Sequence, residues 1–177
     1  MDKLQYIGPL GIPILALSLI GLAIIFERII FYVKLPAADK CSVFEQIKTT
    51  LEENKRQPKY IRDELATYLL IKAKKPFDFG INILRIIAVV SPMLGLLGTV
   101  LGIIEAFKKI ATHEGPVYPA LIAEGLWTAM LTTAAGLIVA LPCLFAAFIF
   151  ARAAEKRIAI YQCQLNKISL EIEGVKI

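Results

Sequence analysis

Three long stretches of the sequence are apolar and contain no charged residue. They cover residues 4–26, 86–104 and 125–151, which are 23, 19 and 27 residues long. Since about 20 apolar residues of helix cross the roughly 30 Å hydrocarbon core of a bilayer, each stretch is long enough to span a membrane. The pattern therefore predicts an all-α integral membrane protein with three transmembrane helices, and it excludes a soluble enzyme.

Six segments follow from these spans. They are 1–31, the N-terminus and first transmembrane helix; 32–80, a cytoplasmic helical loop; 81–110, the second transmembrane helix; 111–124, a periplasmic loop; 125–151, the third transmembrane helix; and 152–177, a cytoplasmic helical tail. The first span is not expected to be a cleaved signal peptide, because its apolar stretch exceeds the 7–15 residues typical of one.

The loop between the first and second spans predicts two short helices. A capping box from Ser42 to Glu45 starts the first, and Pro58 separates it from the second. The second begins near Tyr60 and is expected to end at Pro76, because proline has no N–H to continue the helical hydrogen bonds. A small helical hairpin next to the membrane is the expected result.

The third apolar stretch continues into a regular pattern in the tail. Apolar residues recur at steps of three and four, at Ala154, Ile158, Tyr161, Leu165, Ile168 and Ile172. This heptad-like spacing predicts one continuous helix from Gly125 to Glu173 with a seam that needs a neighbour. The residues expected to mediate ring assembly between subunits are Ile158, Tyr161, Leu165 and Ile168. Packing of the seam against the cytoplasmic loop is the alternative.

Composition and charge agree with a membrane protein. The chain is 57% hydrophobic, with a mean hydropathy of +0.66. Of its 20 lysines and arginines, 17 lie between residues 27 and 85 or after residue 151. Because positive charge is concentrated in cytoplasmic loops, the long loop and the tail are expected in the cytoplasm and the N-terminus outside. The net charge of +5 follows from this asymmetry and requires no nucleic-acid partner.

The second and third spans are rich in small residues. In lipid, small residues let helix backbones approach closely and are the usual contact surface between helices. The residues expected to pack helices together are Gly95, Gly98, Gly102 and Gly136, with Pro92 and Pro142.

Four threonines in these two spans are candidate ion-path residues. They are Thr99, Thr128, Thr132 and Thr133. Each hydroxyl could simply bond to a carbonyl one turn back in its own helix. Together they could also line a polar path for water or an ion, or receive a partner helix. The three uncharged stretches contain no Asp, Glu, Lys, Arg or His. If the chain conducts protons, the titrating group inside the membrane must therefore come from another polypeptide.

No metal, cofactor or catalytic site is predicted. His113 is the only histidine, and the three cysteines have no C-x-x-C spacing. No pairing of a nucleophile with a base is visible, so we expect no enzymatic activity.

Two motifs resemble the signatures of the MotA/TolQ/ExbB proton-channel family. The first is Gly95–Ile104 followed by Ala106-Phe107; the second comprises Gly125-Leu126, Thr132–Leu137 and Val139–Pro142. Glu27-Arg28 is also similar to the family's usual end of the first span. The three-span layout with an outside N-terminus resembles ExbB and TolQ more than the four-span MotA.

This resemblance implies a function and partners. Such proteins form a ring, typically a homopentamer, in the bacterial inner membrane around single-span partners of the ExbD/TolR type, whose span supplies an aspartate. Proton flow is expected to drive mechanical work on outer-membrane transport or envelope processes, with a TonB/TolA-like energy transducer as a further partner. Thr99 and Thr133 match the motif threonines that face the ion path. Thr128 stands where the family commonly has glutamate, which leaves sodium open as an alternative ion.

Two other functions remain in view. A non-conducting membrane scaffold for a multi-subunit complex would need the threonines only for packing. A secondary transporter is disfavoured, because the sequence shows no inverted repeat, broken helix pair or charge near the bilayer midplane.

Overall fold

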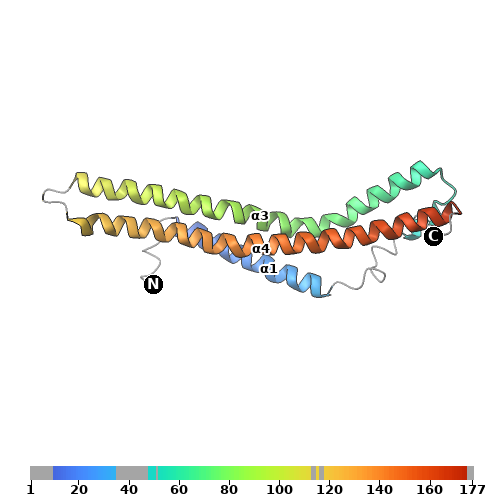
Figure 1. Ribbon diagram of the computed structural model, residues 1–177, viewed down its shortest axis with the longest axis horizontal. Coiled ribbons are helices and arrows are strands. Elements are labelled where there is room, and N and C mark those ends of the chain that lie inside the picture. The colour runs from blue at the N-terminus through green and yellow to red at the C-terminus, as the bar shows by residue number, and fades with distance from the viewer. Residues whose placement is uncertain (1–9, 35–47, 51, 113–114, 116–117, 175–177) are drawn as a thin grey trace. The chain divides into compact units, whose positions relative to one another are not determined.

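The computed structural model describes residues 10–34, 48–50, 52–112, 115 and 118–174. Its long elements are three helices, α1 (Gly11–Lys34), α3 (Lys59–Ala111) and α4 (Pro119–Ile172), shown in Figure 1. Each contains a stretch long and apolar enough to cross a membrane. The predictions of an all-α fold and of three membrane-spanning helices are confirmed. The capping box at Ser42–Glu45 and His113 lie outside the described residues.

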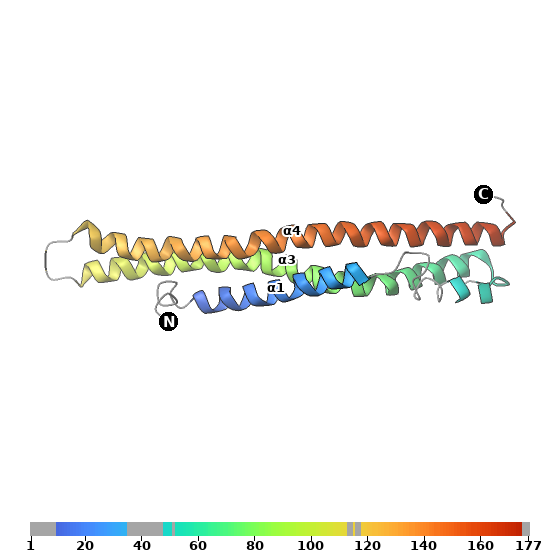
Figure 2. The ribbon, with the colours of Figure 1, turned by 90° about the horizontal axis from the view of Figure 1, so that it is seen from below.

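The three helices contribute to two compact units. The first unit contains α1 up to Phe26, α3 from Asn82 onward and α4 up to Ala147. The second unit contains the end of α1 from Glu27, the start of α3 up to Ile81 and α4 from Phe148. Within each unit, α3 and α4 run side by side in both Figure 1 and Figure 2.

Helix α3 is 53 residues long and passes through Pro76 without a break. The prediction that a loop helix ends at Pro76 is therefore wrong. A proline inside a helix costs about 3 kcal/mol. Continuing the helix buries Phe77 and Ile81, which are 6% and 2% exposed. Burial of two such side chains stabilises by about 1.5–3 kcal/mol each, which is enough to offset the proline.

Helix α4 is 54 residues long and also contains an internal proline, Pro142. It begins at Pro119, six residues before the expected start of the third span, so part of the predicted 111–124 loop is helical. Proline suits the first position of a helix, where its missing N–H would have no partner. The single long helix predicted from Gly125 into the tail is observed.

The seam of the tail lies in the core of the second unit. Tyr161 and Leu165 are 1% and 2% exposed and form a hydrophobic cluster with Ala73 of α3. The partly buried residues around this cluster are Ala66, Leu69, Leu70, Ile158 and Ile168. The neighbour of the seam within one chain is therefore its own α3, and a role of the seam in ring assembly stays a prediction. The loop-packing alternative is what the structure shows.

Candidate functional site

Helices α3 and α4 of the first unit meet along a strip of small residues. The strip on α3 comprises Ser91, Gly95, Gly98, Gly102 and Ala106, and the strip on α4 comprises Gly125, Ala129, Thr132 and Gly136. The contacts run in antiparallel order, from Gly136 against Ser91 to Gly125 against Ala106. We call this contact the small-residue strip.

Two glycines of the strip bring backbone against backbone. A Cβ on Gly136 would lie 2.5 Å from the Ser91 carbonyl oxygen, and a Cβ on Gly95 would lie 2.9 Å from the Thr133 Cα. Real Cβ atoms do not approach other atoms so closely. Because the obstructing atoms are main chain, a side chain at either position would force the helices apart. Glycine is therefore what allows this close packing in lipid.

The other glycines of the strip face small side chains. A Cβ on Gly98 would lie 2.8 Å from the Thr132 Cβ, and one on Gly102 would lie 2.7 Å from the Ala129 Cβ. Of the two prolines expected to pack helices, Pro92 is half-buried and Pro142 is exposed. Sequence reasoning missed Ser91, Ala106 and Ala129. Their signal was the continuation of the glycine spacing at steps of three and four.

The four threonines differ in the carbonyl to which each hydroxyl donates. Thr99 donates to Leu96, Thr128 to Gly125, and Thr132 to both Thr128 and Ala129, so all three bond within their own helix. Thr133 instead donates across the contact to the Gly95 carbonyl on α3, at 2.9 Å. The own-helix interpretation thus describes three threonines, while Thr133 ties α4 to α3.

Burial separates the threonines as well. Thr132 is 3% exposed and lies in the middle of the small-residue strip, against Gly98. Thr99 and Thr133 are half-buried. They lie close together, because Thr133 bonds to Gly95 and Thr99 follows Gly95 by about one turn of α3. These two hydroxyls therefore lie at the edge of the strip.

Helix α1 packs on another side of this pair. A Cβ on Gly21 would meet the Sγ atom of Cys143 on α4 at 2.7 Å and the Cδ1 atom of Ile87 on α3 at 3.8 Å. Thr99 follows Ile87 by 12 residues, which is a rotation of about 120° around α3. Thr99 is consequently directed away from α1.

No metal centre accompanies this site in the described part of the chain. Nowhere among residues 10–34, 48–50, 52–112, 115 and 118–174 do three or more His, Cys, Asp or Glu residues gather. The apolar stretches 4–26, 86–104 and 125–151 contain only apolar and uncharged polar side chains. The chemistry available here is hydrogen bonding by hydroxyls and main-chain carbonyls.

Comparison with known sequences gives this pair of helices its context. Residues 38–163 match the profile of the MotA/TolQ/ExbB proton channel family. The chain belongs to this family. The match includes the whole small-residue strip and all four threonines. The chain is therefore a membrane protein of a proton-channel family.

Several relatives carry related names. Biopolymer transport protein exbB1 of Vibrio cholerae serotype O1 is 41% identical over 117 residues, which are 66% of this chain and 51% of the relative. Biopolymer transport protein ExbB of Pseudomonas putida is 33% identical over 125 residues, covering 69% of this chain and 36% of that protein. The putative biopolymer transport protein ExbB-like 3 of Synechocystis is 25% identical, with 92% of this chain and 90% of the relative covered. The chain thus spans about half, or less, of the first two relatives.

Proposed function

We propose that this chain is the ring-forming subunit of a proton-driven motor in the bacterial inner membrane. Several copies, typically five, would surround the single spans of ExbD/TolR-like partners and convert the proton-motive force into mechanical work on outer-membrane transport or envelope processes. The partner span would supply the titrating aspartate, and a TonB/TolA-like protein would receive the work. Family membership and the relatives named as biopolymer transport proteins support this proposal.

The observation that carries the proposal is the position of Thr99 and Thr133. Both are half-buried at the edge of the small-residue strip, and Thr99 is directed away from α1. Helix α1 would then lie outside the ring, with α3 and α4 lining its interior. A hydroxyl can accept a hydrogen bond while it donates one, so both groups could still bind water or a partner carboxylate.

Chemistry explains why a partner is needed. The uncharged stretches 86–104 and 125–151 offer no carboxylate, amine or imidazole. A proton crossing 100 mV delivers about 2.3 kcal/mol, and a relay inside the membrane needs a group that binds and releases that proton. Threonine does not do so at physiological pH. Thr128 bonds within α4 and likewise provides no titrating group.

The proposed orientation rests on charge. With 17 of 20 lysines and arginines between residues 27 and 85 or after residue 151, the second unit and the C-terminus would be cytoplasmic. The N-terminus and the connection between α3 and α4 would then be periplasmic.

The proposal is tested by proton flux through the chain reconstituted with an ExbD/TolR-like partner. Thr99→Val and Thr133→Val should each lower the flux about tenfold, which corresponds to about 1.4 kcal/mol in the barrier. Thr99→Ser and Thr133→Ser keep the hydroxyl and should retain most of it. Thr67→Val is the matched control, because Thr67 is an exposed threonine of α3 that bonds to the Asp63 carbonyl of its own helix.

Three outcomes would contradict the proposal. Full flux through assembled Thr99→Val and Thr133→Val complexes would mean that the hydroxyls serve packing alone. A complex that assembles but carries no ion would favour the non-conducting scaffold. Flux that depends on sodium and not on the pH gradient would identify the alternative ion.

A further inference from the structure

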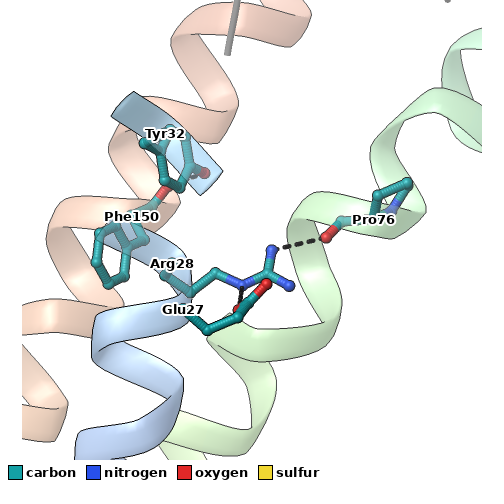
Figure 3. Close-up of polar contacts among 5 residues, drawn as sticks. All are labelled: Glu27, Arg28, Tyr32, Pro76 and Phe150. Atoms are coloured by element: carbon teal, nitrogen blue, oxygen red, sulfur yellow. Dashed lines mark hydrogen bonds and ion pairs between the residues drawn. The ribbon is translucent and has the colours of Figure 1, made fainter. Parts of the chain in front are cut away.

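A buried arginine joins the end of α1 to α3 in the second unit. Arg28 is 7% exposed, and its Nη1 atom donates a hydrogen bond to the carbonyl oxygen of Pro76 at 2.8 Å (Figure 3). Its Nε atom donates to the Glu27 carboxylate at 2.7 Å. Its guanidinium also lies 5.1 Å from the centre of the Phe31 ring. The arginine is therefore held by a main-chain acceptor, a carboxylate and an aromatic face.

The place for this guanidinium depends on Gly80. A Cβ on Gly80 would lie 2.5 Å from the Nε atom of Arg28, 3.0 Å from its Cζ and 3.1 Å from its Cδ. Gly80 is four residues after Pro76, so the two face the arginine from successive turns of α3. Any larger residue at position 80 would displace the guanidinium from its bond to Pro76.

A second bond from α1 reaches the other long helix. The hydroxyl of Tyr32 donates to the carbonyl oxygen of Phe150 on α4 at 3.0 Å, and the two rings stack with centres 5.4 Å apart. Figure 3 shows Arg28 and Tyr32 one turn apart on α1, with their acceptors on different helices. Successive turns of α1 therefore hold α3 and α4 by main-chain atoms.

We propose that Arg28 is a positioning residue that fixes the axial register of α3 against α4 through the Pro76 turn. Each main-chain carbonyl oxygen has a fixed position along its helix. If α3 or α4 shifted along its axis by one turn, the bond to Pro76 or the bond to Phe150 would therefore break. Pro76 is the weak point of α3, because its missing N–H leaves one helical bond unmade. Arg28 of α1 stabilises that turn through its bond to the Pro76 carbonyl, and Gly80 leaves the space that the guanidinium occupies.

The Glu27 carboxylate contributes less to holding Arg28 in place than the Pro76 carbonyl does. Its side chain is 57% exposed, and exposed ion pairs add little because water and salt screen them. A hydrogen bond from a buried guanidinium to a neutral acceptor is charge-assisted and is protected from water. The Pro76 bond, and not the ion pair, is the contact on which the positioning role depends.

A double-mutant cycle tests this role without any assay of ion flux. Amide hydrogen exchange of the α3 turn that follows Pro76 is measured in the full chain in detergent, for Gly80→Ala alone and in an Arg28→Ala background. Gly80→Ala should speed exchange about tenfold in the wild type, since it displaces the guanidinium. In the Arg28→Ala background it should leave exchange unchanged or slow it, because alanine is a better helix former than glycine.

Asn82→Ala, at an exposed position of α3, is the control and should not change exchange of this turn. Equal acceleration by Gly80→Ala in both backgrounds would overturn the proposal, because the methyl group would then act on something other than Arg28.

A second measurement asks whether the register matters for the proposed function, on which this part rests. Proton flux is normalised to the amount of assembled complex with the ExbD/TolR-like partner. Arg28→Gln should lower the flux per complex about tenfold, and Arg28→Lys should recover part of it. Lys75→Gln removes the same charge beside Pro76 and should have no effect. A purely structural residue would change the amount of complex but not the flux through each one.

Unchanged flux per complex in Arg28→Gln would overturn the positioning role. If the wild-type complex carries no protons at all, the proposed function fails, whereas the exchange cycle still decides whether Arg28 holds the Pro76 turn.

Discussion

Gly136 of α4 lies directly against the main-chain carbonyl of Ser91 on α3. A Cβ at position 136 would lie 2.5 Å from that oxygen and 3.2 Å from its carbon. The two backbones are thus in contact at the Ser91–Gly136 end of the small-residue strip, next to Gly95. This contact fixes how closely the two helices of the candidate ion path approach.

Gly136→Ala should therefore destabilise the first unit by about 1–3 kcal/mol or more, because a backbone atom cannot move aside. Gly21→Ala is the matched comparison, since its Cβ would meet the Sγ atom of Cys143, a side-chain atom that can rotate. We expect a smaller loss there, and none in a Cys143→Ala background. Thermal unfolding in detergent, followed by the fluorescence of Trp127, measures both. Equal losses of stability in the two variants would show that the Ser91 carbonyl can move away from an added Cβ.

The hydroxyls of Thr132 and Thr133 should differ in their effect on stability. Thr133 bonds across to α3, whereas Thr132 bonds only within α4. Thr133→Val should lower the unfolding free energy by about 1 kcal/mol, the typical net value of one hydrogen bond. Thr132→Val keeps the side-chain shape and should change it less. Denaturant or thermal unfolding of the two variants makes the comparison, and a larger loss for Thr132→Val would contradict it.

The tail seam should act on the stability of the second unit and not on subunit association. Leu165 is 2% exposed, so Leu165→Ala should destabilise this unit by about 2–5 kcal/mol. Ile160 is 37% exposed on the same helix, and Ile160→Ala is the control with a smaller expected loss. Trypsin cleavage of the tail reports the loss. A tail that stays resistant while the oligomer dissociates would instead return the seam to ring assembly.

An ion pair joins the start of α3 to the end of α4 in the second unit. Arg62 near the start of α3 pairs with Glu173 just after α4, with side-chain exposures of 3% and 40%. Glu173→Gln leaves a buried guanidinium without its carboxylate and should cost about 1–3 kcal/mol, below the usual cost for a fully buried pair because Glu173 is partly exposed. The double variant Arg62→Met with Glu173→Gln should be more stable than Glu173→Gln alone. Hydrogen exchange of the first turns of α3 measures which of these variants is more stable.

The sequence predicted the candidate site in outline because its signals are local. Glycines at steps of three and four indicated where α3 and α4 would touch. The absence of charged residues from the three apolar stretches is visible in the sequence directly. Which threonine crosses to the other helix did not follow. Thr132 and Thr133 are neighbours in sequence, and only the rotation of α4 against Gly95 determines that Thr133 bonds to α3.

By itself, the sequence determined that this protein has three apolar helices, because the length and charge of a stretch decide whether it can leave water. Only the tertiary structure decided that α3 continues through Pro76 and that the seam of Tyr161 and Leu165 faces α3 of the same chain. Both depend on contacts between residues far apart in the sequence. The local rule for proline is overridden because the turn beyond it gains burial, with Phe77 packed against Phe31 and Tyr32 of α1. A heptad pattern indicates that a helix needs a neighbour without indicating which one.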